Sequence, residues 1–303
     1  MYSHQDLVDS LSVEMIDEFL FSGSPLQMAL PRIYGGQILG QALAAAMLTV
    51  EDGEDAKRRP HSMHAYFLRP GDMSRNVIFD VDPIRDGRSF TTRRVVAKQR
   101  GRAIFNASVS FQKIEDGVEH QMDMPDGIPG PEALPEALEQ SRRLARDHGL
   151  SEDVLAGREA NFPSAVIDIR TPFPERLLVA GDYPPSYGYW FRFTADIPSD
   201  PILHRALLAF ISDHALMATA LVANGVNWIS HDIMGASLDH AMWFHTDVRV
   251  DQWLYYHIES PRSARARGLN IGRFYTREGR LIATTAQEGL MRVNGPRKGR
   301  GDA

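Results

Sequence analysis

The stretch RIYGGQILGQALAAAMLTV (residues 32–50) predicts a helix with one face of very small side chains. Gly36, Gly40 and Ala44 recur at every fourth position, and residues four apart lie on the same face of an α-helix. Small residues on that face allow a neighbouring element to approach the helix backbone closely. We expect the neighbour to be a curved β-sheet, since this apolar run is too short to span a bilayer.

A second copy of this pattern follows after a shift of 177 residues, from 35 to 212. Three pairs of segments align in the same order: GGQILGQALAAAM (35–47) with SDHALMATALVAN (212–224), SMHAYFLRP (62–70) with DHAMWFHTD (239–247), and GRAIFNASVSFQ (101–112) with GRLIATTAQEGL (279–290). The last pair is shifted by one residue more than the others. The constant order and spacing predict a duplicated domain, because solenoid repeats have periods of about 20 to 50 residues.

Each copy is expected to contain one helix followed by several antiparallel strands. Runs of β-branched and aromatic residues mark the strands, and RDGR (85–88), QRGR (99–102) and REGR (277–280) mark the turns between them. The fold class is therefore α+β. The predicted division is a first domain over residues 1–115, a Pro-rich and charged linker with one polar helix over 116–164, a second domain over 165–293, and a disordered tail over 294–303.

Composition excludes several classes of function. The chain has 303 residues, a formal net charge of −6 and a pI of about 6.0, and its basic residues are scattered. We therefore expect no binding of nucleic acid and no binding of a membrane. The acidic N-terminus does not resemble a signal peptide, which favours a cytoplasmic location. The absence of cysteine excludes disulfides, thiolate chemistry and cysteine-ligated metals.

Five stretches carry a resemblance to a known family. They are YGGQILGQAL (34–43), HSMHAYFLRPGD (61–72), DGRSFTTRRVVAKQRGRAIFNASVSFQ (86–112), SLDHAMWFH (237–245) and AQEGLMR (286–292). Over nearly its whole length, the chain resembles the acyl-CoA thioesterase II family, whose members carry two fused hotdog domains. The resemblance implies a double hotdog fold, hydrolysis of fatty acyl-CoA to free fatty acid and CoA, no metal or other cofactor, and association into homo-oligomers, either dimers or tetramers.

The resemblance also implies a catalytic set of an Asp, a Thr or Ser, and a Gln. These residue types fall on Asp213, Ser237 and Gln287, all in the second copy. The chain departs from the expected pattern in two ways, since some relatives have Thr in place of Ser237 and an apolar residue in place of His214. A serine keeps the hydroxyl that hydrogen bonding requires, so the first departure leaves the chemistry intact.

The residues alone support a more modest interpretation of these three positions. Asp213 is expected near the start of its helix, where it either caps the free N–H groups or serves as a functional carboxylate. The equivalent residue of the first copy is Gly36, which favours the functional alternative. Strand alternation puts Thr285 and Gln287 on one face, although Ser237 and Gln287 alone would be read as polar residues at a turn and at a sheet edge.

Thioester hydrolysis needs a base that activates water and donors that stabilise the developing oxyanion. Asp213 is the predicted general base, and Ser237 and Gln287 are predicted to hold the water and orient the carboxylate. Gly35 and Gly36 are predicted substrate-binding residues, because backbone N–H groups at a helix start suit an oxyanion. His61 is a candidate accessory residue of the substrate site, with a structural, hydrogen-bonded histidine as the favoured alternative.

Two other functions stay open from the sequence. A hydratase or dehydratase of acyl-CoA on the same fold would need a histidine and a carboxylate at the substrate, yet the adjacent Asp213 and His214 diverge by about 100° on a helix. A non-catalytic acyl-CoA-binding protein is the other alternative.

His61 and His64 do not suit a shared metal ion, because residues three apart on a strand face opposite sides. Five basic residues could meet the phosphates of CoA, although solvated strand faces explain them better: Arg93, Arg94, Lys98, Arg265 and Arg267.

Overall fold

The computed structural model describes residues 1–50 and 58–296. The elements of its first half are α1 (His4–Leu11), β1 (Glu14–Asp17), β2 (Leu20–Gly23), α2 (Gly35–Leu48), β3 (Arg58–Phe67), β4 (Val77–Asp86), β5 (Phe90–Gln99) and β6 (Arg102–Lys113). A 3-10 turn (Pro131–Ala133), α3 (Ala137–His148) and α4 (Glu152–Asn161) follow. The second half contains β7 (Ile167–Arg170), β8 (Ser186–Phe193), α5 (Pro201–Ser212), α6 (Leu216–Val222), β9 (His231–Ser237), β10 (Asp239–Phe244), β11 (Leu254–Ala264), β12 (Arg267–Thr276) and β13 (Leu281–Pro296).

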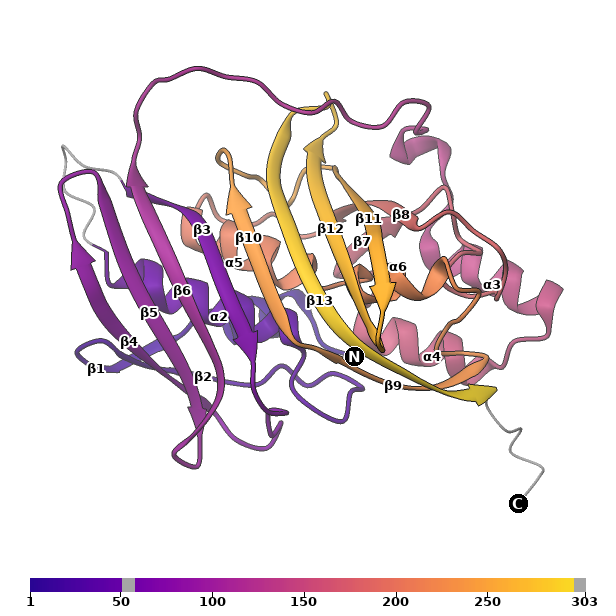
Figure 1. The fold of residues 1–303 in the computed structure, drawn as a ribbon, viewed down its shortest axis with the longest axis horizontal. Helices are drawn as coiled ribbons and strands as arrows, with labels where there is room; N and C mark the ends of the chain where they lie inside the picture. The colour runs from indigo at the N-terminus through magenta and orange to yellow at the C-terminus, as the bar shows by residue number, and fades with distance from the viewer. Residues whose placement is uncertain (51–57, 297–303) are drawn as a thin grey trace.

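One antiparallel sheet crosses the whole molecule, and helices α2 and α5 lie together behind it (Figure 1). The sheet is continuous because β3 of the first half pairs with β10 of the second, with Met63 opposite Met242. From this junction outward, the order is β3-β6-β5-β4 on one side and β10-β13-β12-β11 on the other. The two halves therefore repeat one strand order, which agrees with the duplication predicted from the 177-residue shift.

The small-residue face of α2 packs against another helix, so the predicted contact with the sheet is wrong. A Cβ atom at Gly36 would lie 2.0 Å from the carbonyl oxygen of Phe210, and one at Gly40 would lie 2.7 Å from that of Ala206. Residues 36 and 40 thus meet 210 and 206, so α2 and α5 run antiparallel. Both helices lie behind the same sheet, where the glycines of α2 allow its backbone to pack closely against that of α5.

Helix α5 begins earlier than expected, and this corrects the predicted position of Asp213. The Asp200 side chain accepts a hydrogen bond from the N–H of Ile202 (2.8 Å), and Pro201 occupies the first turn, which is a strong helix start. Asp213 consequently caps the C-terminus of α5 rather than beginning a helix. The chain breaks there, and Ala215 adopts a left-handed φ of 61° before α6 continues.

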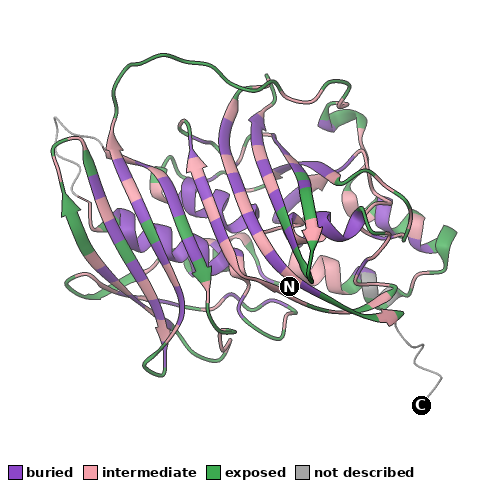
Figure 2. Cartoon of the chain, in the orientation of Figure 1, coloured by how far each residue is buried: buried purple, intermediate pink, exposed green. Residues whose placement is uncertain are grey.

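The apolar segment Pro201–Val222 is long enough to cross a membrane by length and composition, but most of it is buried inside the protein. It forms part of the core together with α2 and the inner face of the sheet. Buried and partly exposed residues alternate along the central strands in Figure 2, as expected of a sheet with one covered face.

The segment between the two copies contains two helices, α3 and α4, rather than the single predicted helix. It packs on the second half, where the Trp190 indole donates to the carbonyl of Pro129 (2.9 Å) and the Gln140 amide donates to that of Thr171 (2.8 Å). Of the predicted disordered tail, residues 294–296 belong to β13, and residues 297–303 lie outside the described residues.

Candidate active site

The carboxylate of Asp213 lies where the two halves meet. Its Oδ2 accepts a hydrogen bond from the backbone N–H of Gly36 at the start of α2 (3.1 Å). Helix α2 has no capping side chain of its own, so a carboxylate from the other half satisfies one of its free N–H groups. The predicted capping role of Asp213 is therefore real but concerns the other helix, whose positive end favours an anion at this place.

Gln287 holds the other oxygen of this carboxylate. Its Nε2 donates to Oδ1 of Asp213 and to Oγ of Ser237, each over 3.1 Å. Ser237 Oγ lies 3.5 Å from Asp213 Oδ1, a long contact for a hydrogen bond. The structure thus brings the three predicted residues together. The interpretation of Gln287 as an exposed or edge residue is wrong, since β13 lies between β10 and β12 and the side chain is fully buried.

A β-bulge decides which face Ser237 occupies. Ser237 pairs with Gly289 and Ala241 pairs with Ala286, so a step of four residues on one strand matches a step of three on β13. The extra residue exchanges the two faces, and Ser237 turns to the side occupied by His240. Strict alternation along the strand would put residues 237 and 240 on opposite faces, whereas both contact Gln287.

His240 was not singled out by the sequence as a site residue. Its ring is completely buried, with Nδ1 2.6 Å from Oε1 of Gln287 and Nε2 3.0 Å from Oγ of Ser212. Burial lowers the pKa of His240, although the hydrogen bond to the Gln287 amide oxygen and the charges of Asp213 and Asp239 oppose this shift. The ring is accordingly neutral near neutral pH, when it can donate only one hydrogen bond.

A pocket of about 630 Å³, the candidate active-site pocket, opens beside this cluster. Asp213, Ser237 and Gly35 contribute to its wall, whereas Gln287 lies behind it. Most of the remaining lining is apolar: Leu30, Ile33, Tyr34, Ile38, Phe67, Leu68, Ile104, Phe105, Phe162, Ala215, Met217, Ala218, Trp228, Ala236 and Leu238. Asp213 is the only carboxylate among the described residues that line it, so a single acid faces a mostly apolar space.

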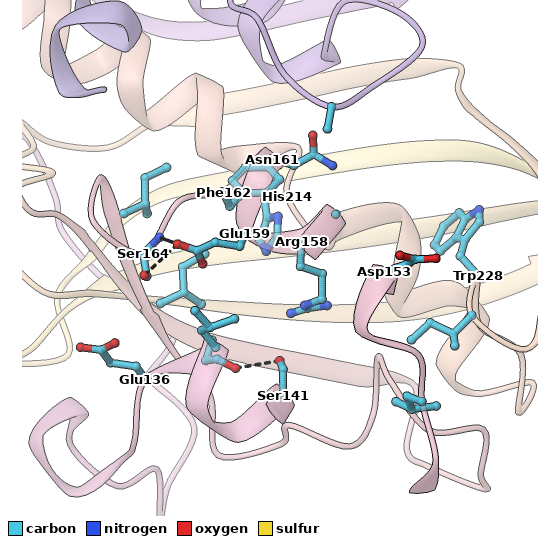
Figure 3. A pocket seen from close by; sticks show the side chains of 18 of the residues that line it. Glu136, Ser141, Asp153, Arg158, Glu159, Asn161, Phe162, Ser164, His214 and Trp228 are labelled. Carbon is cyan, nitrogen blue, oxygen red and sulfur yellow. Dashed lines mark hydrogen bonds between the residues drawn. The ribbon is translucent and has the colours of Figure 1, made fainter. Parts of the chain in front are cut away.

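A second cavity of about 1080 Å³ lies on the other side of Phe162. Phe162 and Trp228 line both spaces, and Figure 3 shows the Phe162 ring against His214, with Arg158 pointing into the cavity. The ring centroids of Phe162 and His214 are 4.2 Å apart. Burial, together with the charge of Arg158, lowers the pKa of His214 to about 3. His214 therefore serves as a neutral aromatic side chain here.

The predicted substrate-binding residues have different surroundings. The N–H of Gly36 is engaged by Asp213, whereas the N–H of Gly35 has no hydrogen-bond partner among the described residues. His61 is not brought to the pocket. It hydrogen-bonds Ser110 (2.8 Å) and packs edge-on against Phe90, as expected of a structural histidine.

Four of the five basic residues considered for CoA phosphates are paired with carboxylates within the protein. The pairs are Arg93 with Asp86, Arg94 with Asp82, Lys98 with Asp80, and Arg267 with Glu288. Two other arginines, Arg32 and Arg69, line the active-site pocket and are exposed. Each donates to a backbone carbonyl, and neither forms an ion pair with a described carboxylate. The sequence alone did not single them out.

Comparisons with known proteins agree with this architecture. A family model described as acyl-CoA thioesterase matches residues 168–290, and one described as acyl-CoA thioesterase N-terminal domain matches residues 24–112. The human protein named acyl-coenzyme A thioesterase 8 is 36% identical over 93% of this chain and 88% of its own length. Acyl-CoA thioesterase 2 of Haemophilus influenzae is 34% identical over 95% of this chain and 98% of its own length.

Solved structures give the same result. An acyl-CoA thioesterase II, TesB2 from Mycobacterium marinum, superposes with a TM-score of 0.74 at 34% identity and covers 96% of this chain and 98% of its own. A hot dog fold protein of unknown function from Alicyclobacillus acidocaldarius has a TM-score of 0.72 at 16% identity, covers 96% of this chain and 99% of its own, and shows the fold alone. The fold and the relatives define a double hotdog thioester hydrolase. The chain belongs to the acyl-CoA thioesterase II family.

Proposed function

We propose that this protein hydrolyses fatty acyl-CoA to free fatty acid and CoA, with Asp213 as the general base of a site in its second half. The observation that carries the proposal is the position of Asp213 as the one carboxylate in the lining of an apolar pocket, held by Gln287 and the N–H of Gly36. A carboxylate oxygen can accept more than one hydrogen bond, so both oxygens retain capacity for a water molecule.

The reaction needs two proton transfers, one from water to Asp213 and one from Asp213 to the leaving sulfur. A water molecule beside Asp213 gives a proton to the carboxylate while its oxygen attacks the thioester carbon, and the carbonyl oxygen becomes an oxyanion. The tetrahedral intermediate then breaks its carbon–sulfur bond, CoA leaves as the thiolate, and the proton passes from Asp213 to the sulfur. Ser237 and Gln287 hold the carboxylate and the water in place, and the unoccupied N–H of Gly35 suits the oxyanion.

The two ends of the substrate have different requirements, which the pocket meets in different places. An acyl chain suits the apolar wall formed by residues such as Ile38, Ile104 and Phe105. The phosphates of CoA suit Arg32 and Arg69, because an arginine with no carboxylate partner can bind phosphate through two hydrogen bonds without first breaking an ion pair.

The alternatives predict different chemistry. A hydratase would need a histidine beside the carboxylate, but His214 lines the second cavity while Asp213 lines the active-site pocket. A non-catalytic acyl-CoA-binding protein would bind without releasing a thiol. Measured release of free CoA thiol therefore distinguishes hydrolysis from both.

The test is thiol release from acyl-CoAs of increasing chain length by the wild type and by Asp213→Asn. The variant is expected to lose about 10²- to 10⁴-fold in kcat and to bind acyl-CoA still. Asp239→Asn is the matched control, because Asp239 is not among the residues that line the pocket and accepts the N–H of Glu288 (2.8 Å), as an asparagine oxygen can, and we expect it to retain its activity. Near-normal hydrolysis by Asp213→Asn would refute the base assignment.

A further inference from the structure

The amide of Gln287 has two possible orientations, and only one of them supports Asp213. With Nε2 toward the carboxylate, its two N–H groups donate to Asp213 Oδ1 and Ser237 Oγ. With the amide turned over, Oε1 would lie about 3 Å from the carboxylate oxygen, and two acceptors would face each other. The orientation therefore depends on what lies at the other end of the amide.

His240 lies at that other end. Its Nδ1 is 2.6 Å from Oε1 of Gln287, and an amide oxygen only accepts hydrogen bonds, so Nδ1 must carry the proton. Because the buried ring is neutral, Nε2 is then unprotonated and can only accept. The hydroxyl of Ser212 lies 3.0 Å from Nε2 and 2.8 Å from the carbonyl of Ala209, so these two acceptors share its single proton.

The surroundings hold the ring in this place. His240 comes from β10, Gln287 from the neighbouring β13 and Ser212 from the last turn of α5, so three elements fix one hydrogen-bonded row. The carbonyl of Ser212 accepts the Tyr256 hydroxyl (2.9 Å), which is itself 2.8 Å from Thr285 Oγ1. Every residue in this row is buried, and water does not compete for these hydrogen bonds.

We propose that His240 is a positioning residue for thioester hydrolysis: its Nδ1–H orients the Gln287 amide so that both amide N–H groups face Asp213 and Ser237. This inference rests on the proposed function of Asp213. His240 does not touch the pocket and acts only through Gln287. This role also accounts for a histidine on a strand face whose other buried residues, Met242 and Phe244, are apolar.

The first experiment compares His240→Leu with His240→Asn in the full chain. Leucine cannot donate to Gln287, so kcat is expected to fall roughly 10- to 100-fold while KM stays within about twofold. Asparagine places its amide nitrogen where Nδ1 lies and can donate to the same oxygen, so kcat is expected to stay within about threefold of the wild type. Equal losses in the two variants would overturn the proposal.

A double-mutant cycle then tests whether His240 acts through Gln287. In the Gln287→Ala background the amide is absent, and His240→Leu is expected to cause no further loss of kcat. The same fold loss in both backgrounds would show that His240 acts independently of Gln287 and would overturn the proposal.

A measurement on the wild type covers the case in which the variants do not fold. Nitrogen-15 NMR of the histidine rings is expected to show a neutral His240 with its proton on Nδ1, and a proton on Nε2 would overturn the inference. This readout is independent of the base assignment. Normal thiol release by Asp213→Asn would refute the proposed function, whereas the NMR result and the cycle decide the role of His240.

Discussion

The carboxylate of Asp213 accepts the backbone N–H of Gly36, the residue 177 positions earlier that occupies the same place in the other repeat. At this position the first copy supplies a backbone N–H donor and the second a carboxylate acceptor. A side chain at Gly36 would collide with α5, and the absence of one leaves the N–H accessible to the carboxylate. One glycine therefore serves both the packing of the two helices and the candidate active site.

Gly36→Ala is expected to destabilise the protein by about 3 kcal/mol, because its Cβ would lie 2.0 Å from a backbone oxygen that cannot move without separating α2 from α5. Hydrolysis is expected to fall as well, since the contact to Asp213 would be displaced. Urea unfolding measures the first effect and thiol release the second. The control is Gly157→Ala in α4, where a Cβ meets nothing within 4 Å, and an unchanged or slightly raised stability is expected. Equal stability of the two variants would contradict the close packing.

Phe162 lines both the active-site pocket and the second cavity, as Asn161 and Trp228 do, so Phe162→Ala is expected to join them and to shift the preferred substrate toward longer acyl chains. The measurement is kcat/KM over a series of acyl-CoAs. Ile104→Ala is the control, since Ile104 lines only the active-site pocket, and it is expected to change the rates without extending the preferred length. A length profile that stays unchanged in Phe162→Ala would rule out this role for the ring.

Arg32→Gln and Arg69→Gln are each expected to raise KM for acyl-CoA about tenfold and to change kcat little, because the phosphates of CoA remain bound at the same distance throughout the reaction. The dependence of KM on salt is expected to weaken in both variants. Arg94→Gln is the control, since Arg94 is already paired with Asp82 (2.9 Å). If acyl-CoA binding stays equally salt-dependent in the double variant Arg32→Gln/Arg69→Gln, the phosphates of CoA bind at another place.

His214 is expected to make the protein sensitive to acid. Its pKa is lowered to about 3 in the folded state by burial and by Arg158, from an ordinary value of 6.5. Below pH 6.5 the unfolded chain therefore binds a proton that the folded chain does not, and stability falls with decreasing pH until about pH 3, by at most about 1.4 kcal/mol per pH unit. Above pH 6.5 this contribution to stability is complete.

His214→Phe removes the titrating group and keeps an aromatic ring against Phe162. The loss of stability between about pH 7.5 and about pH 5, measured by urea unfolding, is expected to be smaller in the variant than in the wild type. The same loss in both proteins would mean that His214 takes up its proton equally well in the folded state.

Some features of the site follow from local sequence patterns. Alternation along residues 284–288 predicts that Thr285 and Gln287 share a face, and both are buried on the same side of β13. The start of α5 could also have been read from Asp200 and Pro201, a cap followed by proline, which would have placed Asp213 at the far end of that helix.

Other features could not be predicted from the sequence, for a physical reason. The bulge between Ser237 and Ala241 depends on the register of two strands. One extra residue moves every side chain beyond it to the opposite face of the sheet. His240 appeared as one more member of an alternating run, since burial and hydrogen bonding to Gln287 become visible only when β10 lies beside β13. Phe162 belongs to the connecting segment, and nothing in its neighbours along the chain relates it to the pocket.

The sequence by itself determined that the chain is a duplicated α+β protein, and its resemblance to a known family pointed to the acid, hydroxyl and amide of the second copy. The duplication and the elements can be predicted because periodicity and repeated spacing reflect the backbone geometry of short segments. Only the tertiary structure decided that the carboxylate of one copy meets the helix start of the other. That contact joins residues 177 apart, and it exists because the glycines of α2 let its backbone approach α5 more closely than a side chain at those positions would allow.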